Sequence, residues 1–222
     1  MAMIEESVAR LRAAGVSSLN FDLMYGLPGQ SIGDLEATLD ETLRLSPDRV
    51  ALFGYAHLPS VITRQRRIDG SALPGVEERF AQAALGFDRL TNAGYAAIGF
   101  DHFALPGDPL ARAARDGQLR RNFQGFTDDP SDIVLGLGAS AISQFPDLIV
   151  QNEKLAGRYR MLVSAGNLAG HRGIVRTGDT RRRATIIERL LCAGAAEIPK
   201  DLLAAARGHL EIFEERVLLV VS

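Results

Sequence analysis

The pattern of hydrophobic and polar positions predicts that helices and strands follow each other in turn through the first hundred residues. Three segments carry apolar side chains at helical spacing: residues 3–14, 31–45 and 75–93. Three short, mostly apolar segments are typical of strands: residues 17–24, 49–55 and 95–103. Ser31, followed by Asp34 three residues later, predicts the start of the second helix. This alternation with short connections favours a parallel sheet covered by helices, and hence an α/β fold.

Beyond Pro106 the pattern is less regular. Three further segments have helical character: residues 108–116, 152–166 and 180–194. Residues 120–127 are expected to be irregular, and residues 132–143 form a glycine-rich apolar stretch. The chain ends on VLLVVS, an apolar run for which the sequence suggests no partner.

Composition narrows the class of protein. With 222 residues, 46% hydrophobic and 23% charged, the chain is typical of a globular protein, and its net charge of −2 gives no reason to expect a nucleic-acid partner. The amphipathic N-terminal segment does not resemble a signal peptide, and no apolar run approaches the roughly 20 residues of a membrane span. We therefore expect a cytoplasmic protein without a membrane partner.

Two features favour a piece of a longer protein. The first helix has no strand before it, and the apolar run at the end of the chain would be exposed unless something covers it. Three parallel strands alone would also leave an open sheet edge. The single cysteine, Cys192, excludes an internal disulfide, and it excludes a metal or iron–sulfur site built from several thiolates of this chain.

Polar side chains near the ends of the expected strands are the first candidates for chemistry. Ligands of parallel α/β sheets bind beyond the carboxyl ends of the strands. Asp22 interrupts the strand in NFDLMYGLPGQ, and its carboxylate could accept both hydroxyls of a ribose or bind turn amides in a structural role. His57 follows the second strand and His102 lies at the end of the third, where they could relay protons, bind a carboxylate or serve as hydrogen-bonded core residues.

Other segments are weaker candidates. The small residues of GLGAS could form a phosphate turn or let the backbone approach a flat ligand or a neighbouring helix, and Phe123 and Gln124 could contact a planar group or pack an ordinary loop. Five arginines flank these segments and could bind a polyanionic small molecule or form a solvated face: Arg64, Arg66, Arg67, Arg120 and Arg121.

Five strings, in this order, resemble the oxygen-independent coproporphyrinogen III oxidase family: NFDLMYGLPGQ, ALFGYAHLPS, YAAIGFDHFALPGDPL, RRNFQGFT and LGLGASAIS. The resemblance runs from about residue 3 to residue 194. A related family of haem chaperone-like radical S-adenosylmethionine (SAM) proteins shares the first string. Those proteins tend to carry YEISNFA-type and RHNxxYW-type strings in place of the third and fourth, so the AHLP, DHFA and NFQG elements favour the oxidase.

The resemblance implies a partial (β/α) radical SAM barrel followed by a mostly helical C-terminal domain. It implies a 4Fe–4S cluster bound by a CxxxCxxC loop, two SAM molecules and coproporphyrinogen III as substrate. A 5′-deoxyadenosyl radical would take hydrogen from a propionate, and loss of CO2 and an electron would leave a vinyl group, twice, giving protoporphyrinogen IX. The alternative is the chaperone-like relative, which would bind haem or porphyrin without decarboxylation.

Position by position, the resemblance assigns five residues to cofactor binding: Asp22, Ala56, Phe123, Gln124 and Ile142. Asp22 matches an acidic residue that contacts SAM, while Ala56 and Ile142 match backbone contacts. Phe123 and Gln124 lie in the NFQG element, near the second SAM.

His57 and His102 match rim histidines, and we take them as candidates for a catalytic role. The resemblance also implies a division into the second half of the barrel (residues 1–105), a segment covering the active site (106–170) and a truncated helical domain (171–222). A monomer is implied for the full-length protein, and the electron donor is not identified.

The chain departs from the family where the cluster should be bound. The CxxxCxxC loop is absent, as is the first half of the barrel, and after about Pro199 the similarity fades. Because a cluster needs thiolate ligands, we expect the chain by itself to lack a metal site and oxidase activity.

Overall fold

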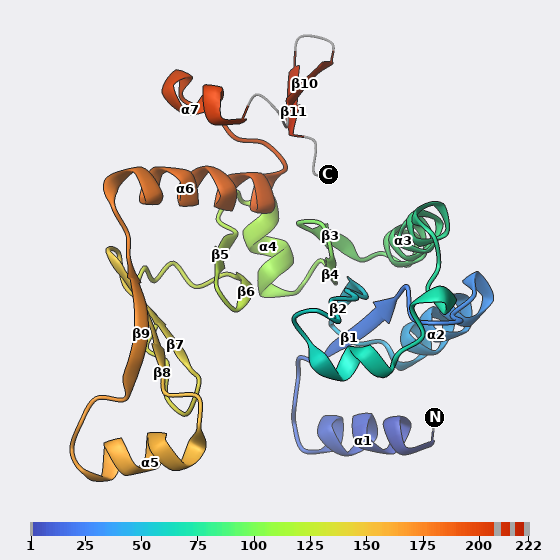
Figure 1. Cartoon of the computed structure of the whole chain (residues 1–222). Coiled ribbons are helices and arrows are strands. Elements are labelled where there is room, and N and C mark those ends of the chain that lie inside the picture. Colours follow the sequence, from blue (N-terminus) through green and yellow to red (C-terminus); the bar gives the residue numbers. More distant parts are fainter. Residues whose placement is uncertain (1, 207–209, 214–215, 220–222) are drawn as a thin grey trace. The chain divides into compact units, whose positions relative to one another are not determined.

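The computed structural model describes residues 2–206, 210–213 and 216–219, which are traced in Figure 1. The chain divides into two compact units, Met1–Asp129 and Pro130–Ser222. The three-part division implied by the family resemblance, with boundaries after residues 105 and 170, stays a prediction.

The first unit begins with the expected alternation of helices and strands. Helix α1 (Ala2–Ala13) precedes strand β1 (Asn20–Tyr25), helix α2 (Ile32–Leu45) and strand β2 (Arg49–Gly54). Strands β1 and β2 are parallel, and they pair in register from Asn20 with Arg49 to Tyr25 with Gly54. The parallel arrangement predicted from the sequence is therefore confirmed for these two strands.

Helix α2 begins at a capping box, as the sequence predicts. The backbone amide of Asp34 donates to the Ser31 hydroxyl at 3.2 Å, and the Asp34 carboxylate accepts from the Ser31 amide at 2.9 Å. The hydrogen bonds from the Ser31 hydroxyl and amide hold the pKa of Asp34 below its ordinary value. Two donors at the helix start are thus satisfied by one pair of residues.

The third strand was predicted with the wrong direction and the wrong length. Helix α3 (Val76–Asn92) is followed by two short strands, β3 (Ala96–Ile98) and β4 (His102–Ala104), which pair antiparallel. Gly99 adopts φ 62°, a left-handed conformation that a glycine reaches without strain, so the chain reverses inside the apolar run. Strand β4 then pairs antiparallel with β2, and the sheet has the order β1-β2-β4-β3.

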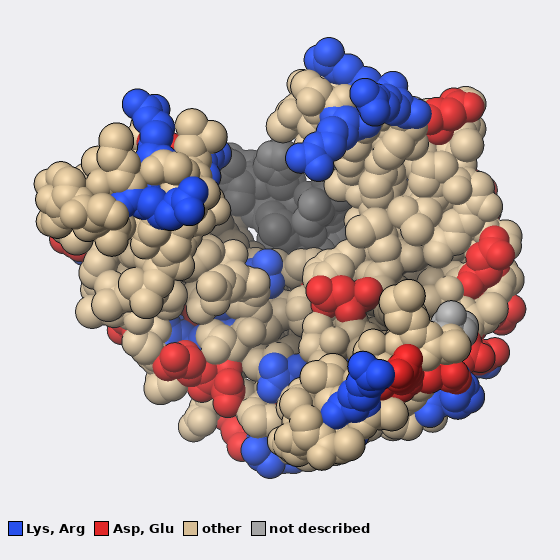
Figure 2. Space-filling view, turned by 90° about the horizontal axis from the view of Figure 1, so that it is seen from below, with Lys and Arg blue, Asp and Glu red and all other residues tan. Residues whose placement is uncertain are grey.

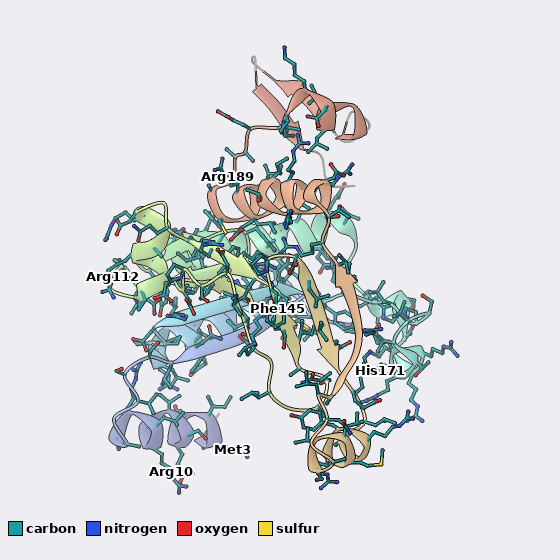
Figure 3. The ribbon with its side chains drawn as sticks, turned by 90° about the vertical axis from the view of Figure 1, so that its left-hand side faces the viewer. Met3, Arg10, Arg112, Phe145, His171 and Arg189 are labelled. Atoms are coloured by element: carbon teal, nitrogen blue, oxygen red, sulfur yellow. The ribbon has the colours of Figure 1, made fainter. Side chains whose placement is uncertain are left out.

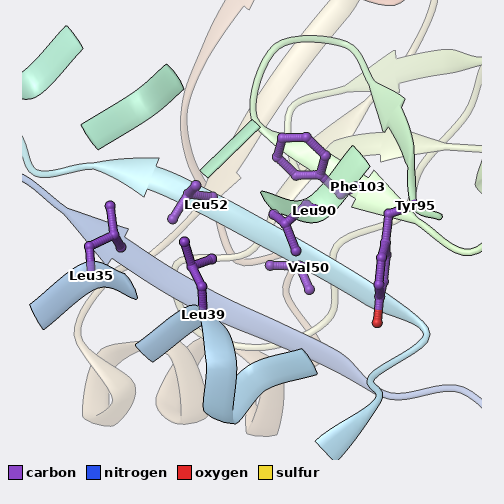
Figure 4. Packing of buried hydrophobic residues seen from close by; sticks show 7 residues of the cluster. All are labelled: Leu35, Leu39, Val50, Leu52, Leu90, Tyr95 and Phe103. Carbon is purple, nitrogen blue, oxygen red and sulfur yellow. The ribbon is translucent and has the colours of Figure 1, made fainter. Parts of the chain in front are cut away.

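The hydrophobic core of this unit lies between the sheet and the helices α2 and α3. Figure 4 shows seven of its side chains. They come from both helices, from β2 and from the hairpin: Leu35, Leu39, Val50, Leu52, Leu90, Tyr95 and Phe103. Helix α3 approaches β2 closely at Gly86. A Cβ placed on this glycine would lie 2.1 Å from a methyl of Leu52. A side chain at position 86 would therefore force the Leu52 side chain to move.

Helix α4 and a second hairpin complete the first unit. Asp108 caps α4 (Pro109–Arg115), and its carboxylate also accepts from Arg49 Nε at 2.8 and 2.7 Å. Residues 120–127, expected to be irregular, form an antiparallel hairpin of β5 (Arg120–Asn122) and β6 (Gly125–Thr127). The expectation was wrong because the NFQG turn, with Gly125 at φ 139°, allows the chain to reverse.

Two short 3-10 helices lie in the long connection between β2 and α3. They are η1 (Thr63–Arg67) and η2 (Gly70–Ala72), the second of which begins at an Asp69 cap. Gln65 fixes the connection to the end of β2, because its side chain accepts from the Leu58 amide and donates to the Ala56 carbonyl at 2.9 Å.

The second unit contains more strands than the sequence pattern indicates. Strands β7 (Ile142–Gln144), β8 (Leu148–Asn152) and β9 (Gly170–Val175) form an antiparallel sheet. Helix α5 (Ala156–Ser164) connects β8 to β9, and α6 (Gly178–Ala193) follows β9. Figure 3 labels Phe145, after β7, and His171, on β9.

The end of the described chain consists of α7 (Lys200–Ala206) and an antiparallel pair, β10 (Leu210–Phe213) and β11 (Arg216–Leu219). The apolar run VLLVVS was expected to be unpaired, but its first three residues lie in β11 and pair with β10. Its last three lie outside the described residues. Among the described residues, no helix is both long and apolar enough to cross a membrane.

Candidate functional site

The carboxyl end of β1 continues into a tight turn. The Gln30 amide donates to the Leu27 carbonyl at 3.1 Å, and between them stand Pro28 and Gly29, the latter at φ 69°. These features define a type II turn, in which only the third residue needs a positive φ. The Gln30 side chain closes the turn, since it donates to the Met24 carbonyl at 3.2 Å and accepts from the Leu27 amide at 3.1 Å. The segment GLPGQ therefore forms a closed turn directly after the strand that carries Asp22.

Asp22 lies on the face of β1 that points away from the hydrophobic core. Leu23 and Tyr25 pack against the core cluster, so by strand alternation Asp22 and Met24 point to the opposite face. Asp22 is exposed, and its Oδ1 accepts from Asn20 Nδ2 at 2.7 Å. Within the described residues Oδ2 accepts no hydrogen bond, so the carboxylate can still accept from hydroxyl groups of a ligand.

Asp22 and His102 lie in the same row across the sheet. Asp22 pairs in register with Ala51, and Ala51 pairs with His102. Residues paired in this way project from the same face, and two strand spacings put their Cα atoms roughly 10 Å apart. The structure therefore brings together two of the candidate residues, with the fully buried Ala51 between them.

The position of His102 differs from the one expected. It was predicted to lie at the carboxyl end of a parallel strand, but it is the first residue of the antiparallel β4. The reversal at Gly99 therefore places His102 beside the middle of β2. His57, in contrast, follows the end of β2, as predicted.

A carboxylate orients the His102 ring. Asp101 Oδ1 lies 2.6 Å from His102 Nδ1, and both side chains are mostly buried. An ionised carboxylate can only accept, so Nδ1 carries the proton, and in the neutral ring Nε2 is left as an acceptor. The rings of Phe53 and Phe126 meet His102 edge to face, with centroids at 5.7 and 5.3 Å. The arrangement could transfer a proton or bind an acidic group.

The β5–β6 hairpin is attached to the same face through Phe126. The Arg121 guanidinium lies 4.7 Å from the centre of the Phe126 ring and 5.7 Å from that of Phe100. Phe123 and Gln124 form the hairpin turn, where the Gln124 amide donates to Asn122 Oδ1 at 2.8 Å. Both turn side chains are exposed, so they are available to a planar ligand.

Ala56 and His57 stand just beyond β2. The Tyr55 amide donates to the Tyr25 carbonyl at 2.8 Å, which extends the pairing of the two strands by one residue. His57 is half-buried, with Nδ1 3.4 Å from the Tyr55 hydroxyl. The Ala56 carbonyl accepts from Gln65, and a carbonyl oxygen can accept a second hydrogen bond.

Ile142 belongs to the second unit, where it starts β7 after the glycine-rich segment. A Cβ on Gly136 would come within 2.5 Å of the Ile142 carbonyl oxygen, so the two backbones are in direct contact. Asn152 Nδ2 donates to the carbonyls of Gly136 and Gly138 at 3.1 and 3.0 Å. The Gly138 amide donates to the Tyr159 hydroxyl at 3.0 Å. The close approach that Gly136 allows is to the backbone of strand β7, whereas the sequence suggested a flat ligand or a neighbouring helix as its partner.

Several residues of these regions were not identified from the sequence. Arg79 on α3 donates to the Tyr55 carbonyl at 2.8 Å and occupies the space beside Gly26. Gln82, on the buried face of the same helix, donates to the Gln30 carbonyl at 2.9 Å. Gln82 could have been identified from the sequence, because it is a glutamine on an otherwise apolar helix face. No local pattern marks Arg79.

The donor set of the chain does not fit an iron–sulfur cluster. Cys192, its one cysteine, is half-buried on α6. In the part of the chain that the structure describes, no three His, Cys, Asp or Glu side chains converge as metal ligands.

Comparisons with known proteins agree with this architecture. No family model matches the chain. The structure is similar to that of a coproporphyrinogen III oxidase, HemN, from Escherichia coli, whose title calls it a radical SAM enzyme. The TM-score is 0.83 at 34% identity, covering 98% of this chain and 54% of the other. The fold is therefore that of part of a radical SAM protein, and the expected fold class is confirmed.

Relatives found by sequence narrow this class. Proteins named oxygen-independent coproporphyrinogen III oxidase from Cereibacter sphaeroides and Bradyrhizobium diazoefficiens are each 46% identical, over 192 and 191 residues. Each match covers 86% of this chain, and the chain spans about 42% of the length of these relatives. A third, from Thermostichus vulcanus, is 43% identical over 183 residues. The chain is thus homologous to part of the oxygen-independent coproporphyrinogen III oxidases, as its motifs indicated.

Proposed function

We propose that this chain supplies the nucleoside-binding and substrate-binding half of a radical SAM coproporphyrinogen III oxidase. The proposed reaction converts two propionates of coproporphyrinogen III into vinyl groups, giving protoporphyrinogen IX. The observation that carries the proposal is the 46% identity to enzymes of that name over 86% of the chain. The cluster ligands must come from another polypeptide segment, because the chain has one cysteine.

The exposed face of the first unit fits the nucleoside part of SAM. The unoccupied Oδ2 of Asp22 would accept a ribose hydroxyl, and the Ala56 backbone would contact the adenosine part of the same molecule. Phe123 and Gln124 would contact a second SAM, and Ile142 would contribute a backbone contact. When bound, SAM supplies the radical that starts the reaction.

His102 and His57 have separate proposed tasks. His102, held by Asp101, would exchange a proton with substrate through Nε2 or bind a propionate. His57, beside Tyr55, would line the rim beyond β2.

A fusion protein tests the proposal. The chain is joined behind the N-terminal half of one of its relatives, which carries the CxxxCxxC loop, and the cluster is reconstituted without oxygen. We expect protoporphyrinogen IX from coproporphyrinogen III, and none from the same fusion with the three loop cysteines replaced by serine. A fusion that contains its cluster, binds SAM and forms no product would overturn the proposal. Porphyrin binding without decarboxylation would then support the chaperone-like alternative.

A further inference from the structure

Three arginines and three apolar side chains gather on the connection that follows β2. They are Leu58, Val61, Ile62, Arg64, Arg66 and Arg67, and we call them the 58–67 surface. All six are exposed, with Val61 at 76% and Leu58 at 50% of full exposure. Exposed apolar groups among cations are suited to a ligand that is itself part apolar and part anionic.

The three cations are available to a ligand. Within the described residues, Arg64, Arg66 and Arg67 form no ion pair, although many other arginines do, among them Arg10, Arg12, Arg44, Arg49, Arg89, Arg115, Arg158, Arg182 and Arg183. The nearest acid along the chain, Asp69, uses its carboxylate on the amide and hydroxyl of Ser71, at 2.9 and 2.7 Å. These hydrogen bonds lower the pKa of Asp69, so it stays ionised and engaged there.

The backbone of the 58–67 surface is well fixed. The amides of Val61 and Ile62 donate to the Leu58 carbonyl at 3.0 and 2.7 Å. Arg66 Nε donates to the Pro59 carbonyl at 3.2 Å, which positions its guanidinium and leaves the terminal nitrogens for another acceptor. Residues three apart in a 3-10 helix lie above one another, so Arg64 and Arg67 share a side of η1. Several cations on a fixed backbone can bind several carboxylates of one rigid molecule.

The surface adjoins the proposed site directly. Gln65 lies between the arginines, and it hydrogen-bonds both the Leu58 amide and the carbonyl of Ala56, the proposed SAM contact. A ligand on the 58–67 surface would therefore lie beside the rim formed by the ends of β1 and β2. On the face shown in Figure 2, Lys and Arg side chains lie in small groups, as do Asp and Glu side chains.

We propose that the 58–67 surface binds the propionate edge of the tetrapyrrole substrate. The arginines would hold propionates that are not being decarboxylated, while Leu58, Val61 and Ile62 would contact the apolar ring edge. Coproporphyrinogen combines a large apolar macrocycle with four carboxylates, which matches the two kinds of side chain present. This inference rests on the proposed function, because it concerns the same substrate.

Direct binding to the whole chain tests the inference without a cluster or turnover. The probe is coproporphyrin III, the stable oxidised macrocycle with the same four propionates, and binding is followed by its fluorescence. We expect saturable binding that weakens roughly tenfold in the variant Arg64→Gln/Arg66→Gln/Arg67→Gln. A second variant, Val61→Ser/Ile62→Ser, should also weaken it while leaving the charges in place.

A matched control has the same change of charge elsewhere. Arg160, Arg181 and Arg189 are exposed arginines of the second unit, with Arg189 labelled in Figure 3. Replacing all three by glutamine should change the affinity by less than about twofold. Equal weakening by both triple variants, or no effect of the first, would overturn the inference. It would also be overturned if the unsubstituted chain failed to bind the probe, or bound anionic lipid vesicles in its place.

The two proposals can fail separately. If the fusion forms product while the variant with the substituted 58–67 surface binds coproporphyrin normally, only the proposal that this surface binds the substrate is refuted. If the arginines are needed for binding but the fusion forms no product, the proposed oxidase activity is refuted, and the 58–67 surface is still supported as a tetrapyrrole-binding site.

Discussion

Gly136 and Ile142 touch through their backbones, and a side chain at position 136 would lie 2.5 Å from the carbonyl oxygen of Ile142. This contact brings the glycine-rich segment against the start of β7. Ile142 is one of the proposed SAM contacts, so the position of its backbone depends on a residue six positions earlier.

We therefore expect Gly136→Ala to destabilise the second unit. The new methyl group meets backbone atoms, which cannot rotate away, and overpacking of this kind costs about 1–3 kcal/mol. Urea unfolding measures the change. Gly157→Ala in α5 is the control, because nothing lies within 4 Å of its added Cβ, and it should leave stability equal or slightly higher. Equal effects of the two substitutions would contradict the prediction.

The Asp101–His102 pair predicts one tautomer of the imidazole. Because the carboxylate accepts from Nδ1, the neutral ring should carry its proton there, and nitrogen NMR of histidine-labelled protein can show it. In Asp101→Ala the His102 signal should shift toward the other tautomer, while the His57 signal stays unchanged. An unchanged His102 signal would show that the carboxylate does not orient the ring.

Asp22→Asn should weaken SAM binding by the fusion protein. Hydrogen bonds to a charged group contribute about 1.5–3 kcal/mol, so the loss should be roughly 10- to 100-fold. Asp88→Asn, which neutralises an exposed carboxylate on α3, is the control. Equilibrium dialysis with labelled SAM measures both. Unchanged affinity in Asp22→Asn would show that Asp22 does not contribute to SAM binding.

Arg49 and Asp108 form the most deeply buried ion pair that the structure describes, with the Asp108 side chain 2% exposed. Asp108→Ala leaves the Arg49 charge without its partner and removes the cap of α4, so we expect a loss of about 3–5 kcal/mol in unfolding free energy. Asp116→Ala, in an ion pair that is more than half exposed, should cost less than about 1 kcal/mol. Chemical denaturation of both variants is the measurement, and similar losses would refute the distinction.

Stability should fall in acid partly through Asp48. Burial opposes its ionisation, but hydrogen bonds from the Leu19 amide and from Arg12, at 2.8 and 2.7 Å, hold its pKa below the ordinary value. The unfolded state then binds more protons near pH 4, so this contribution is complete above about pH 4 and is lost as pH falls through the lowered pKa. The difference between the chain and Asp48→Asn in urea should shrink between pH 7 and 3. A constant difference would exclude this role.

The sequence alone predicted those elements whose signals are local. Ser31 and Asp34 define the start of α2, and the short, mostly apolar segment around Asp22 predicts β1, because both signals depend on neighbouring residues. The reversal at Gly99 was missed because YAAIGFDHF is continuously apolar apart from Asp101 and His102, and a glycine inside such a run does not by itself indicate a turn. Strands β8 and β9 were missed because their pairing joins residues far apart in the chain.

The sequence predicted which residues belong to the candidate site better than it predicted how they are arranged. Asp22 and His102 were both chosen from the sequence, and the structure puts them in one row across the sheet. They were expected to meet at the carboxyl ends of parallel strands. The antiparallel pairing of β4 with β2 instead places His102 beside the middle of β2, in the row of Asp22. Arg79 and Gln65 act through contacts that no local pattern predicts.

Strand β4 carries two neighbouring side chains that together determine its register against β2. His102 and Phe103 are adjacent, yet one lies on the face of Asp22 and the other in the core. Because successive side chains of a strand point to opposite faces, a slip of β4 by one residue against β2 would exchange their places. A polar ring would then enter the core while Phe103 replaced it beside Ala51. The pair therefore disfavours any register of β4 that differs from the observed one by an odd number of residues.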